Sequence, residues 1–318
     1  MTLLSLDLMS NKLLIISGPT ATGKTSLACE IAKEFNGELI SADSRQIYRG
    51  MDIGTGKDHP KDTTIHLIDI INPNESFSVA QYRLLGLEKI KEIQSREKLP
   101  IIVGGTGQYI DSIINPQETF SVKPNNFLRF FLNKFSLSLL QLTLKTLNFK
   151  TFKLLNNSDR NNPRRLIRKI EIRLLRRFTP RNDVIAPARP SGGSEAWQSR
   201  LNYLHLSLTA PNPLLFSKIN QRVEDRLKNG LLKEIESLLK KYKWTDPGLN
   251  TLAYKEFSHL NKGRSLNDCV TQWQSDEHKY VRRQKTWFKK QPNLFFIDVS
   301  KTSKKQIIDM VSKWYNKL

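Results

Sequence analysis

The segment LLIISGPTATGKTSLACEIAKEF, residues 13–35, decides the fold. It begins with a short apolar run that is typical of a buried parallel strand. The run ends at the loop 18–25, GPTATGKT, which matches the phosphate-binding pattern G-x-x-x-x-G-K-[ST] in full. A helix is expected next, because Leu27, Ile31 and Phe35 recur at helical spacing. A strand, a glycine-rich loop and a helix in this order predict a phosphate site where the loop meets the helix.

The residue types of this loop match the chemistry of a phosphate site. Glycines let backbone N–H groups converge on phosphate oxygens, and the helix N-terminus adds a partial positive charge. Lys24 is expected to reach the terminal phosphate, and the Thr25 hydroxyl is expected to bind Mg²⁺. The motif does not distinguish a diphosphate from a triphosphate, and the alternative is a glycine-rich turn that matches by coincidence. The expected phosphate-binding residues are Gly18, Pro19, Thr20, Ala21, Thr22, Gly23, Lys24 and Thr25.

Strands and helices continue to alternate outside this segment. Short apolar runs at 38–41, 66–70 and 100–103 are expected strands, and 78–95 is an expected helix with Ser78 as its N-cap. We therefore predict an α/β fold, a P-loop NTPase-like parallel sheet with helices on both faces. Towards the C-terminus, strands are expected at 202–208 and 294–299, and helices at 213–229, 231–242, 249–258, 265–290 and 303–314.

The middle of the chain has a different composition. Residues 127–153 contain no acidic side chain, and 163–178 have the pattern of a strongly basic helix. Residues 179–193 hold three prolines and two glycines, which is typical of a loop or linker. The simplest organisation places the first part of the α/β core at 1–114, a basic all-helical insertion at 115–200, and the remainder of the core at 201–318.

Charge is distributed unevenly over the 318 residues, whose formal net charge is +21. Residues 1–110 carry 12 basic and 13 acidic side chains, whereas residues 111–318 carry 39 and 17. A composition bias of the whole chain would have charged the first third as well. We therefore expect the second part to bind a polyanion, for which nucleic acid and an anionic membrane surface are the candidates.

Several functional classes do not fit the sequence. Cys29 and Cys269 have no nearby Cys or His at metal-ligand spacing, so a zinc site is not expected. A low cysteine content fits a reducing compartment. The N-terminal segment lacks a basic n-region, and no apolar run approaches the ~20 residues of a membrane span. We expect a cytoplasmic monomer with no membrane partner.

Two further segments follow expected strands and should point into the same crevice. Asp43 follows the strand at 38–41, and the glycine-rich segment 104–107 follows the strand at 100–103. Two roles are open for Asp43, either a helix N-cap or a catalytic group that binds Mg²⁺ or accepts a proton. Thr106 can offer its hydroxyl to phosphate or substrate, although a plain glycine-rich turn explains this segment equally well.

Seven motifs occur in an order and spacing that extend over most of the chain. They are GPTATGKT (18–25), SADSRQIYRGMDIGTGK (41–57), HLIDIINPNESFSVAQYR (66–83), PIIVGGTGQYI (100–110), NPRRLIRKIEI (162–172), LAYKE (252–256) and RRQKTWFK (282–289). Together they resemble the bacterial tRNA dimethylallyltransferase family. Asn250 and Ala253 depart from it, since the family usually has Arg and Gly in this stretch.

The resemblance implies prenyl transfer to tRNA. Such enzymes move a dimethylallyl group from dimethylallyl diphosphate to N6 of adenosine-37, 3′-adjacent to the anticodon of tRNAs that read codons starting with U, and release diphosphate. The phosphate-binding loop would then hold the diphosphate of this donor, with Mg²⁺ near Thr25. Asp43 matches the catalytic aspartate of the family, Thr106 matches a threonine near the target base, and Arg226 matches an arginine that contacts the diphosphate.

The resemblance also implies where tRNA binds. The basic insertion would hold the anticodon arm, and the target adenosine would leave its stack to enter the crevice. The alternative for each basic stretch is a solvated charged face. The implied tRNA-binding residues are Asp43, Ser44, Arg45, Gln46, Arg164, Arg165, Leu166, Ile167, Arg168, Asn250, Tyr254, Lys255, Arg282, Arg283, Gln284, Thr286 and Lys289.

Two other functions compete with this interpretation. The phosphate-binding loop alone favours a nucleotide or small-molecule kinase that binds ATP, but a kinase does not need the positive charge beyond residue 110. A basic RNA-binding protein that has lost catalysis is the second alternative. The presence of Lys24, Thr25 and Asp43 argues against it.

Overall fold

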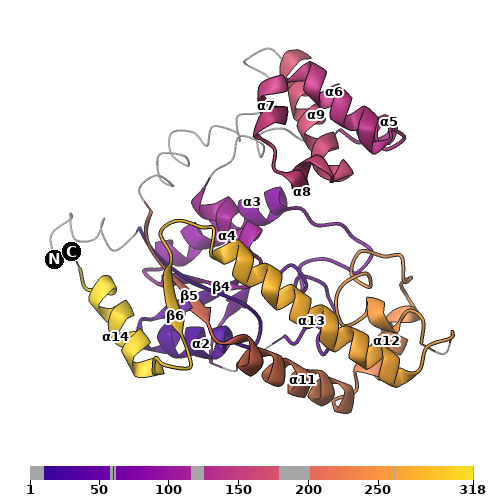
Figure 1. Cartoon of the computed structure of the whole chain (residues 1–318). Helices are drawn as coiled ribbons and strands as arrows, with labels where there is room; N and C mark the ends of the chain where they lie inside the picture. Colours follow the sequence, from indigo (N-terminus) through magenta and orange to yellow (C-terminus); the bar gives the residue numbers. More distant parts are fainter. Residues whose placement is uncertain are drawn as a thin grey trace. The chain divides into compact units, whose positions relative to one another are not determined.

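A parallel six-stranded sheet forms the centre of one unit of the chain (Figure 1). The computed structural model describes residues 11–57, 60, 62–115, 125–178, 201–260 and 262–317. Every strand pair is parallel, in the order β3-β2-β4-β1-β5-β6. The strands are β1 (Lys12–Ser17), β2 (Gly37–Ser41), β3 (Ile65–His66), β4 (Leu99–Gly104), β5 (Asn202–Thr209) and β6 (Phe295–Asp298).

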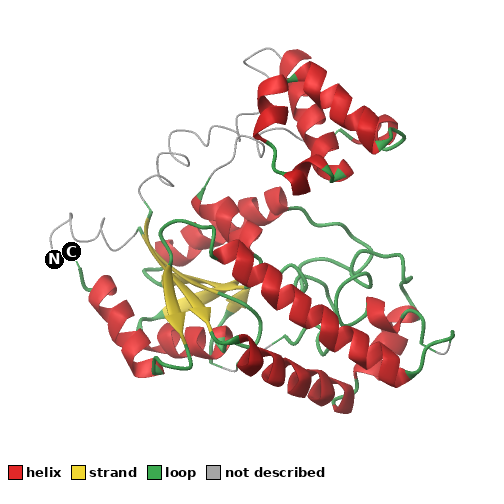
Figure 2. Cartoon of the chain, viewed as in Figure 1, coloured by secondary structure: helices red, strands yellow, loops and turns green. Residues whose placement is uncertain are grey.

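Helices cover both faces of this sheet (Figure 2). Leu14 and Ile16 of β1 pack on one face with α2 (Lys24–Glu34) and α14 (Lys304–Tyr315). Leu13 and Ile15 alternate with them and are fully buried on the opposite face. On that face lie α3 (Val79–Ser95), which starts with a capping box at Ser78, and α4 (Gly107–Ile114). The predicted α/β fold with a P-loop-like parallel sheet is confirmed.

A second core lies beside the sheet. It is built by α11 (Asn212–Lys228), α12 (Leu231–Leu239), α13 (Leu266–Phe288) and the short 3₁₀ helix η2 (Lys255–Phe257). Trp273 of α13 and Leu215 of α11 are fully buried in it. The sheet and this second core together make one compact unit, Met1–Asn115 and Arg200–Leu318, which we call the sheet unit.

The other unit, Pro116–Ser199, is called the helical unit here. Its described helices are α5 (Asn126–Leu132), α6 (Leu137–Leu147), α7 (Phe149–Leu154), α8 (Asn157–Arg160) and α9 (Pro163–Phe178). Leu140, Leu144 and Ile170 form its core. Glu171 is buried beside this core and is neutralised by Arg129 at 2.8 Å and Arg168 at 2.6 Å. Both arginines belong to the helical unit, so this unit pairs its buried carboxylate with its own residues.

Two expected elements differ in the structure. The strand expected at 66–70 ends at His66, because Leu67 and Asp69 have left-handed backbone angles, with φ of 61° and 55°. The helix expected at 249–258 is reduced to η2, because Ala253 has a φ of 76° and interrupts helical geometry. The linker expected at 179–193 lies outside the described residues. None of the described helices is long and apolar enough to span a membrane.

Candidate active site

Strand order brings three loops together at the carboxyl edge of the sheet. Strand β4 lies between β2 and β1, so the loops that follow these three strands are neighbours. The N–H of Thr106 donates to the carbonyl of Ala42 at 3.0 Å, which joins the loops after β4 and β2. A side chain at Gly104 would lie 2.3 Å from the same carbonyl oxygen, so only glycine permits this approach.

The phosphate-binding loop lies between β1 and α2, as predicted. Gly23 has a φ of 81° and forms the N-cap of α2, so the loop leads directly into the helix N-terminus. The Lys24 ammonium donates to the Pro19 carbonyl at 2.6 Å, and the Thr22 hydroxyl donates to the same oxygen at 2.9 Å. Burial lowers the pKa of Lys24 to about 7, against the opposing effect of Asp43. An anionic diphosphate here would favour the charged lysine.

Asp43 lies in a turn and not at the start of a helix. Its Oδ1 accepts a hydrogen bond from the backbone N–H of Arg45 at 2.9 Å, which is an Asx turn. The hydroxyl of Thr106 accepts from the N–H of Ser44 at 3.0 Å. The helix N-cap considered for Asp43 is therefore wrong. The structure places Asp43 and Thr106 on adjacent loops that are bonded to each other.

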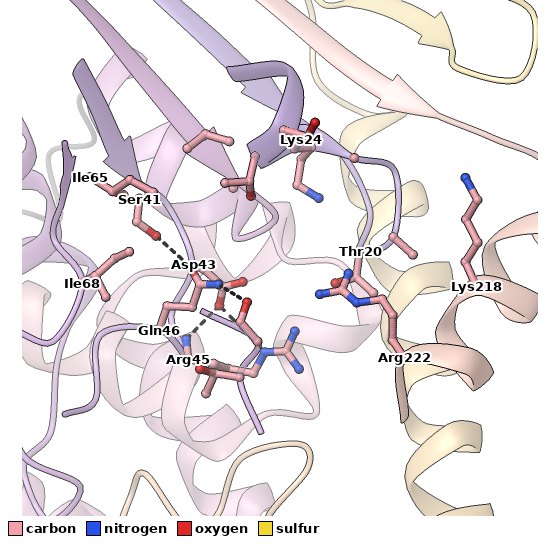
Figure 3. Close-up of a pocket in the computed structure, with 18 of the residues that line it drawn as sticks. Thr20, Lys24, Ser41, Asp43, Arg45, Gln46, Ile65, Ile68, Lys218 and Arg222 are labelled. Atoms are coloured by element: carbon pink, nitrogen blue, oxygen red, sulfur yellow. Dashed lines mark hydrogen bonds and ion pairs between the residues drawn. The ribbon is translucent and has the colours of Figure 1, made fainter. Parts of the chain in front are cut away.

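A cavity of about 530 Å³ brings together Lys24, Thr25 and Asp43 (Figure 3), whereas the predicted catalytic residues Thr106 and Arg226 are not among its lining residues. In Figure 3, Lys24 and Asp43 lie on the sheet side of it, and Lys218 and Arg222 project from α11. Its described lining residues are Thr20, Ala21, Gly23, Lys24, Thr25, Ser26, Ser41, Asp43, Arg45, Gln46, Thr55, Gly56, Ile65, Ile68, Val103, Gly104, Lys218, Gln221 and Arg222. Cations around a carboxylate suit the binding of an anion next to a proton acceptor.

Two of these cations were not identified from the sequence. Lys218, Arg222 and Arg226 recur every four residues on α11, so they lie along one side of the helix. This spacing is the signal that would have identified the first two. The Arg226 guanidinium instead donates to the Gly54 carbonyl at 3.0 Å. Burial lowers the pKa of Arg226 to about 10, and the charge of Arg222 acts in the same direction. Contact between Arg226 and the diphosphate remains a prediction.

Helix α12 holds the loop that Arg226 contacts. The carboxylate of Glu234 accepts the backbone N–H groups of Asp52 at 2.9 Å, Ile53 at 2.7 Å and Gly54 at 3.1 Å. It also accepts the hydroxyl of Tyr254 at 2.7 Å. The next two residues of this loop line the cavity, so Glu234 fixes part of the cavity wall. Tyr254 is fully buried, so its side chain supports this loop, and its contact with tRNA stays a prediction.

Gln284 of α13 has an internal role as well. Its Oε1 accepts from the N–H of Thr20 at 3.1 Å, and its Nε2 donates to the Gly105 carbonyl at 2.9 Å. Gln284 therefore connects the phosphate-binding loop to the loop after β4. Its side chain is buried and both ends are engaged, and the predicted tRNA contact of this residue stays a prediction.

Two predicted tRNA contacts belong to the core of the helical unit. Leu166 and Ile167 are buried on α9 and pack with Leu140 and Leu144 of α6. They form the apolar side of a helix whose other side is charged, so a continuous sequence motif combines both. Their contact with tRNA, as part of the stretch 164–168, stays a prediction.

The other predicted tRNA contacts divide into surface and cavity residues. Arg45 is buried and Gln46 half-buried, and both line the cavity. Arg168 is half-buried and bonded to Glu171 at 2.6 Å. The exposed ones are Arg164, Arg165, Asn250, Lys255, Arg282, Arg283, Thr286 and Lys289.

Comparison with known proteins decides the family. The family model described as IPP transferase matches residues 46–291, more than half of the chain. The chain belongs to the IPP transferase family. A second model, described as Isopentenyl transferase, matches residues 11–71, which include the phosphate-binding loop.

Curated relatives of this IPP transferase match it over nearly their whole length. The tRNA dimethylallyltransferase of Roseiflexus sp. (strain RS-1) is 35% identical over 310 residues, which cover 95% of this chain and 98% of the relative. That of Acetivibrio thermocellus is 38% identical over 314 residues, with coverage of 96% and 97%. The solved structure of a tRNA isopentenylpyrophosphate transferase from Bacillus halodurans has a TM-score of 0.68 at 30% identity, with coverage of 96% and 97%.

Proposed function

We propose that this IPP transferase moves a dimethylallyl group from dimethylallyl diphosphate to N6 of adenosine-37 in tRNA, 3′-adjacent to the anticodon, and releases diphosphate. The observation that supports this reaction most directly is that Lys24, Asp43 and Arg222 line the same cavity. It combines cations for a diphosphate with a carboxylate for an amine. The similarity to tRNA dimethylallyltransferases supplies the substrate class.

Charge development in this reaction explains the cations. Negative charge grows on the diphosphate as the bond between carbon and oxygen breaks. The phosphate-binding loop, Lys24 and the α11 cations Lys218 and Arg222 would stabilise that charge more strongly in the transition state than in the bound donor. Arg226, one turn further along α11, is proposed to support the same diphosphate.

Asp43 is proposed to act on the nucleophile. The N6 amine of adenine attacks the allylic carbon and must lose a proton, and a carboxylate in the cavity can accept it or orient the amine. Thr106 lies on the adjacent loop and is proposed to contact the same base. Apolar cavity residues such as Ile65 and Ile68 would face a five-carbon donor group.

The residues present fit Mg²⁺ near Thr25. Thr25 lines the cavity at the start of α2, and its hydroxyl offers a hard oxygen atom of the kind that Mg²⁺ prefers. No group of three or more His, Cys, Asp or Glu side chains that could hold a metal occurs among the described residues. This fits an ion held mainly by substrate phosphates and water. When bound, Mg²⁺ would neutralise charge on the diphosphate.

Exposed basic residues are proposed to bind the tRNA backbone. In the helical unit these are Arg164 and Arg165 of α9, and in the sheet unit they include Arg282, Arg283 and Lys289 at the end of α13. Lysine and arginine at the surface bind phosphates by charge, without reading sequence. A tRNA substrate is consistent with the proposed cytoplasmic location, and a monomeric state stays a prediction.

Label transfer tests the proposed function. Purified protein is mixed with Mg²⁺, radiolabelled dimethylallyl diphosphate and unmodified tRNA that carries the target adenosine. We expect label in tRNA, and we expect Asp43→Ala to reduce its rate by about two decades or more while tRNA binding persists. Asp62→Asn, an exposed carboxylate that pairs with Lys33, serves as the control with unchanged rate. ATP hydrolysis or phosphoryl transfer without label in tRNA would favour the kinase alternative.

A further inference from the structure

Arg45, which lines the cavity beside Asp43, forms a buried ion pair with Glu277, a residue that the sequence analysis did not single out. Glu277 of α13 is 2% exposed, and Arg45 is 6% exposed. The Arg45 Nη1 donates to Glu277 Oε1 at 2.9 Å, and Trp273 Nε1 donates to the same oxygen at 3.4 Å. A buried carboxylate is stable only when it is paired in this way, so Glu277 strongly restrains the Arg45 guanidinium.

The same guanidinium faces the catalytic candidate. Its Nε lies 3.8 Å from Asp43 Oδ1, which is an ion-pair distance and too long for a good hydrogen bond. The Arg45 backbone N–H is the group that bonds this oxygen, at 2.9 Å. The ring of Tyr280 lies under the guanidinium, 4.9 Å from its central carbon. Arg45 is thus held by Glu277 on one side and by Tyr280 from below.

Competition between the two carboxylates follows from this geometry. An arginine fork binds a carboxylate best through two short hydrogen bonds. Glu277 takes one such bond, and Asp43 receives only the long contact. Without the charge of Glu277, Asp43 would be the nearest anionic partner for a buried guanidinium. A direct bond from Arg45 would then engage the Asp43 carboxylate that the amine needs.

We propose that Glu277 is a positioning residue, which draws Arg45 away from Asp43 and so keeps the Asp43 carboxylate available to the substrate amine. This proposal rests on the proposed prenyl transfer for its kinetic consequence, but its structural consequence is independent of the reaction. Glu277 acts through Arg45 and does not touch the substrate. Its position on α13 fits this role, because Gln284, two turns further along the helix, also bonds active-site loops.

The crystal structure of Glu277→Gln tests the geometry. Glutamine keeps the size of the side chain and removes its charge. We expect the Arg45 guanidinium to move to Asp43, with at least one N–O distance below about 3.2 Å. If Arg45 keeps its present distance of 3.8 Å from Asp43, the proposal is overturned. The crystal structure gives this result even if the wild-type protein transfers no label. Failure of this proposal can therefore be distinguished from failure of the proposed function.

Kinetics of the same variant test the consequence. We expect kcat to fall about 10- to 100-fold while KM for donor and for tRNA changes less than about twofold. The reason is that only the availability of the Asp43 carboxylate is affected. Asp276→Asn removes a neighbouring carboxylate on α13 that pairs with Lys279, and it should leave kcat unchanged. Unchanged kcat in Glu277→Gln, with only a lower melting temperature, would mean that the pair is purely structural and would overturn the proposal.

A second substitution distinguishes positioning from general damage. Arg45→Met added to Glu277→Gln removes the cation that would occupy Asp43. The kcat of the double variant should be at least threefold higher than that of Glu277→Gln alone, because the two changes are coupled through one contact. Independent losses that simply multiply would contradict the proposal.

Discussion

Replacing Glu234 by glutamine should destabilise the loop that forms part of the cavity wall. One carboxylate there accepts four hydrogen bonds, three of them from the consecutive backbone N–H groups of residues 52–54 and one from the Tyr254 hydroxyl. Glutamine offers only one oxygen. With its amide nitrogen at the Oε1 position, the bond from the Gly54 N–H is lost, the Tyr254 hydroxyl must turn to accept, and the bonds that remain lose the charge of the carboxylate.

The magnitude follows from the contacts. A hydrogen bond to a charged group contributes roughly 1.5–3 kcal/mol and a neutral one roughly 0.5–1.5 kcal/mol, so one lost bond and the weakening of the others give about 3–6 kcal/mol. Glu234 is half-buried, so water can reach the site and the lower end, about 3 kcal/mol, is expected. The donor should also bind more weakly, since Thr55 and Gly56 of this loop line the cavity.

Urea unfolding of the full chain measures the first effect, and the KM for dimethylallyl diphosphate measures the second. Glu236→Gln is the matched control, because Glu236 is an exposed carboxylate on the same helix, and its effect should stay within about 0.5 kcal/mol. A loss below about 1 kcal/mol in Glu234→Gln would show that water replaces the carboxylate at little cost. The reasoning from the four contacts would then be refuted.

Three further predictions follow from backbone strain and shifted pKa values. Ala253→Gly should raise the unfolding free energy by about 1 kcal/mol in urea melts, because alanine at a φ of 76° is strained, whereas Ala28→Gly in regular helix should lower it. Burial lowers the pKa of His205, which bonds Ser17, to about 4, so the free energy of unfolding should fall as pH decreases from 6.5 towards 4. The substitution His205→Gln should flatten that decline. Parallel curves of unfolding free energy against pH for the two proteins would contradict this expectation. Burial lowers the pKa of Lys24 to about 7, so the protein should take up a proton when the diphosphate donor binds at pH 8. Calorimetry of donor binding in buffers of different ionisation enthalpy measures this uptake. Identical binding heats in all buffers would exclude it.

The sequence by itself determined the fold class and the first part of the site. The apolar strand, the loop 18–25 and the following helix form a local signal, because each depends on neighbouring residues only. The positions of Asp43 and Thr106 after strands could also be predicted, since the carboxyl ends of parallel strands share one edge. The IPP transferase motifs, spread over most of the chain, correctly indicated the family.

Burial was decided only by the tertiary structure. Four residues of the predicted tRNA-binding stretches, Leu166, Ile167, Tyr254 and Gln284, have buried side chains, which their motifs did not indicate. A motif records which residues occur together, and it does not distinguish those that touch a ligand from those that support them. Only the packed partner, such as Leu144 for Leu166, makes that distinction.

Contacts between distant segments were likewise invisible in the sequence. Arg45 and Glu277 are 232 positions apart, and Gln284 bonds loops that lie 264 and 179 positions away. No local pattern pairs such residues, because only the docking of α13 against the sheet edge brings them together. Residue types and local spacing therefore predicted the phosphate-binding loop and the sheet, whereas the arrangement of charges around Asp43 depends on long-range packing.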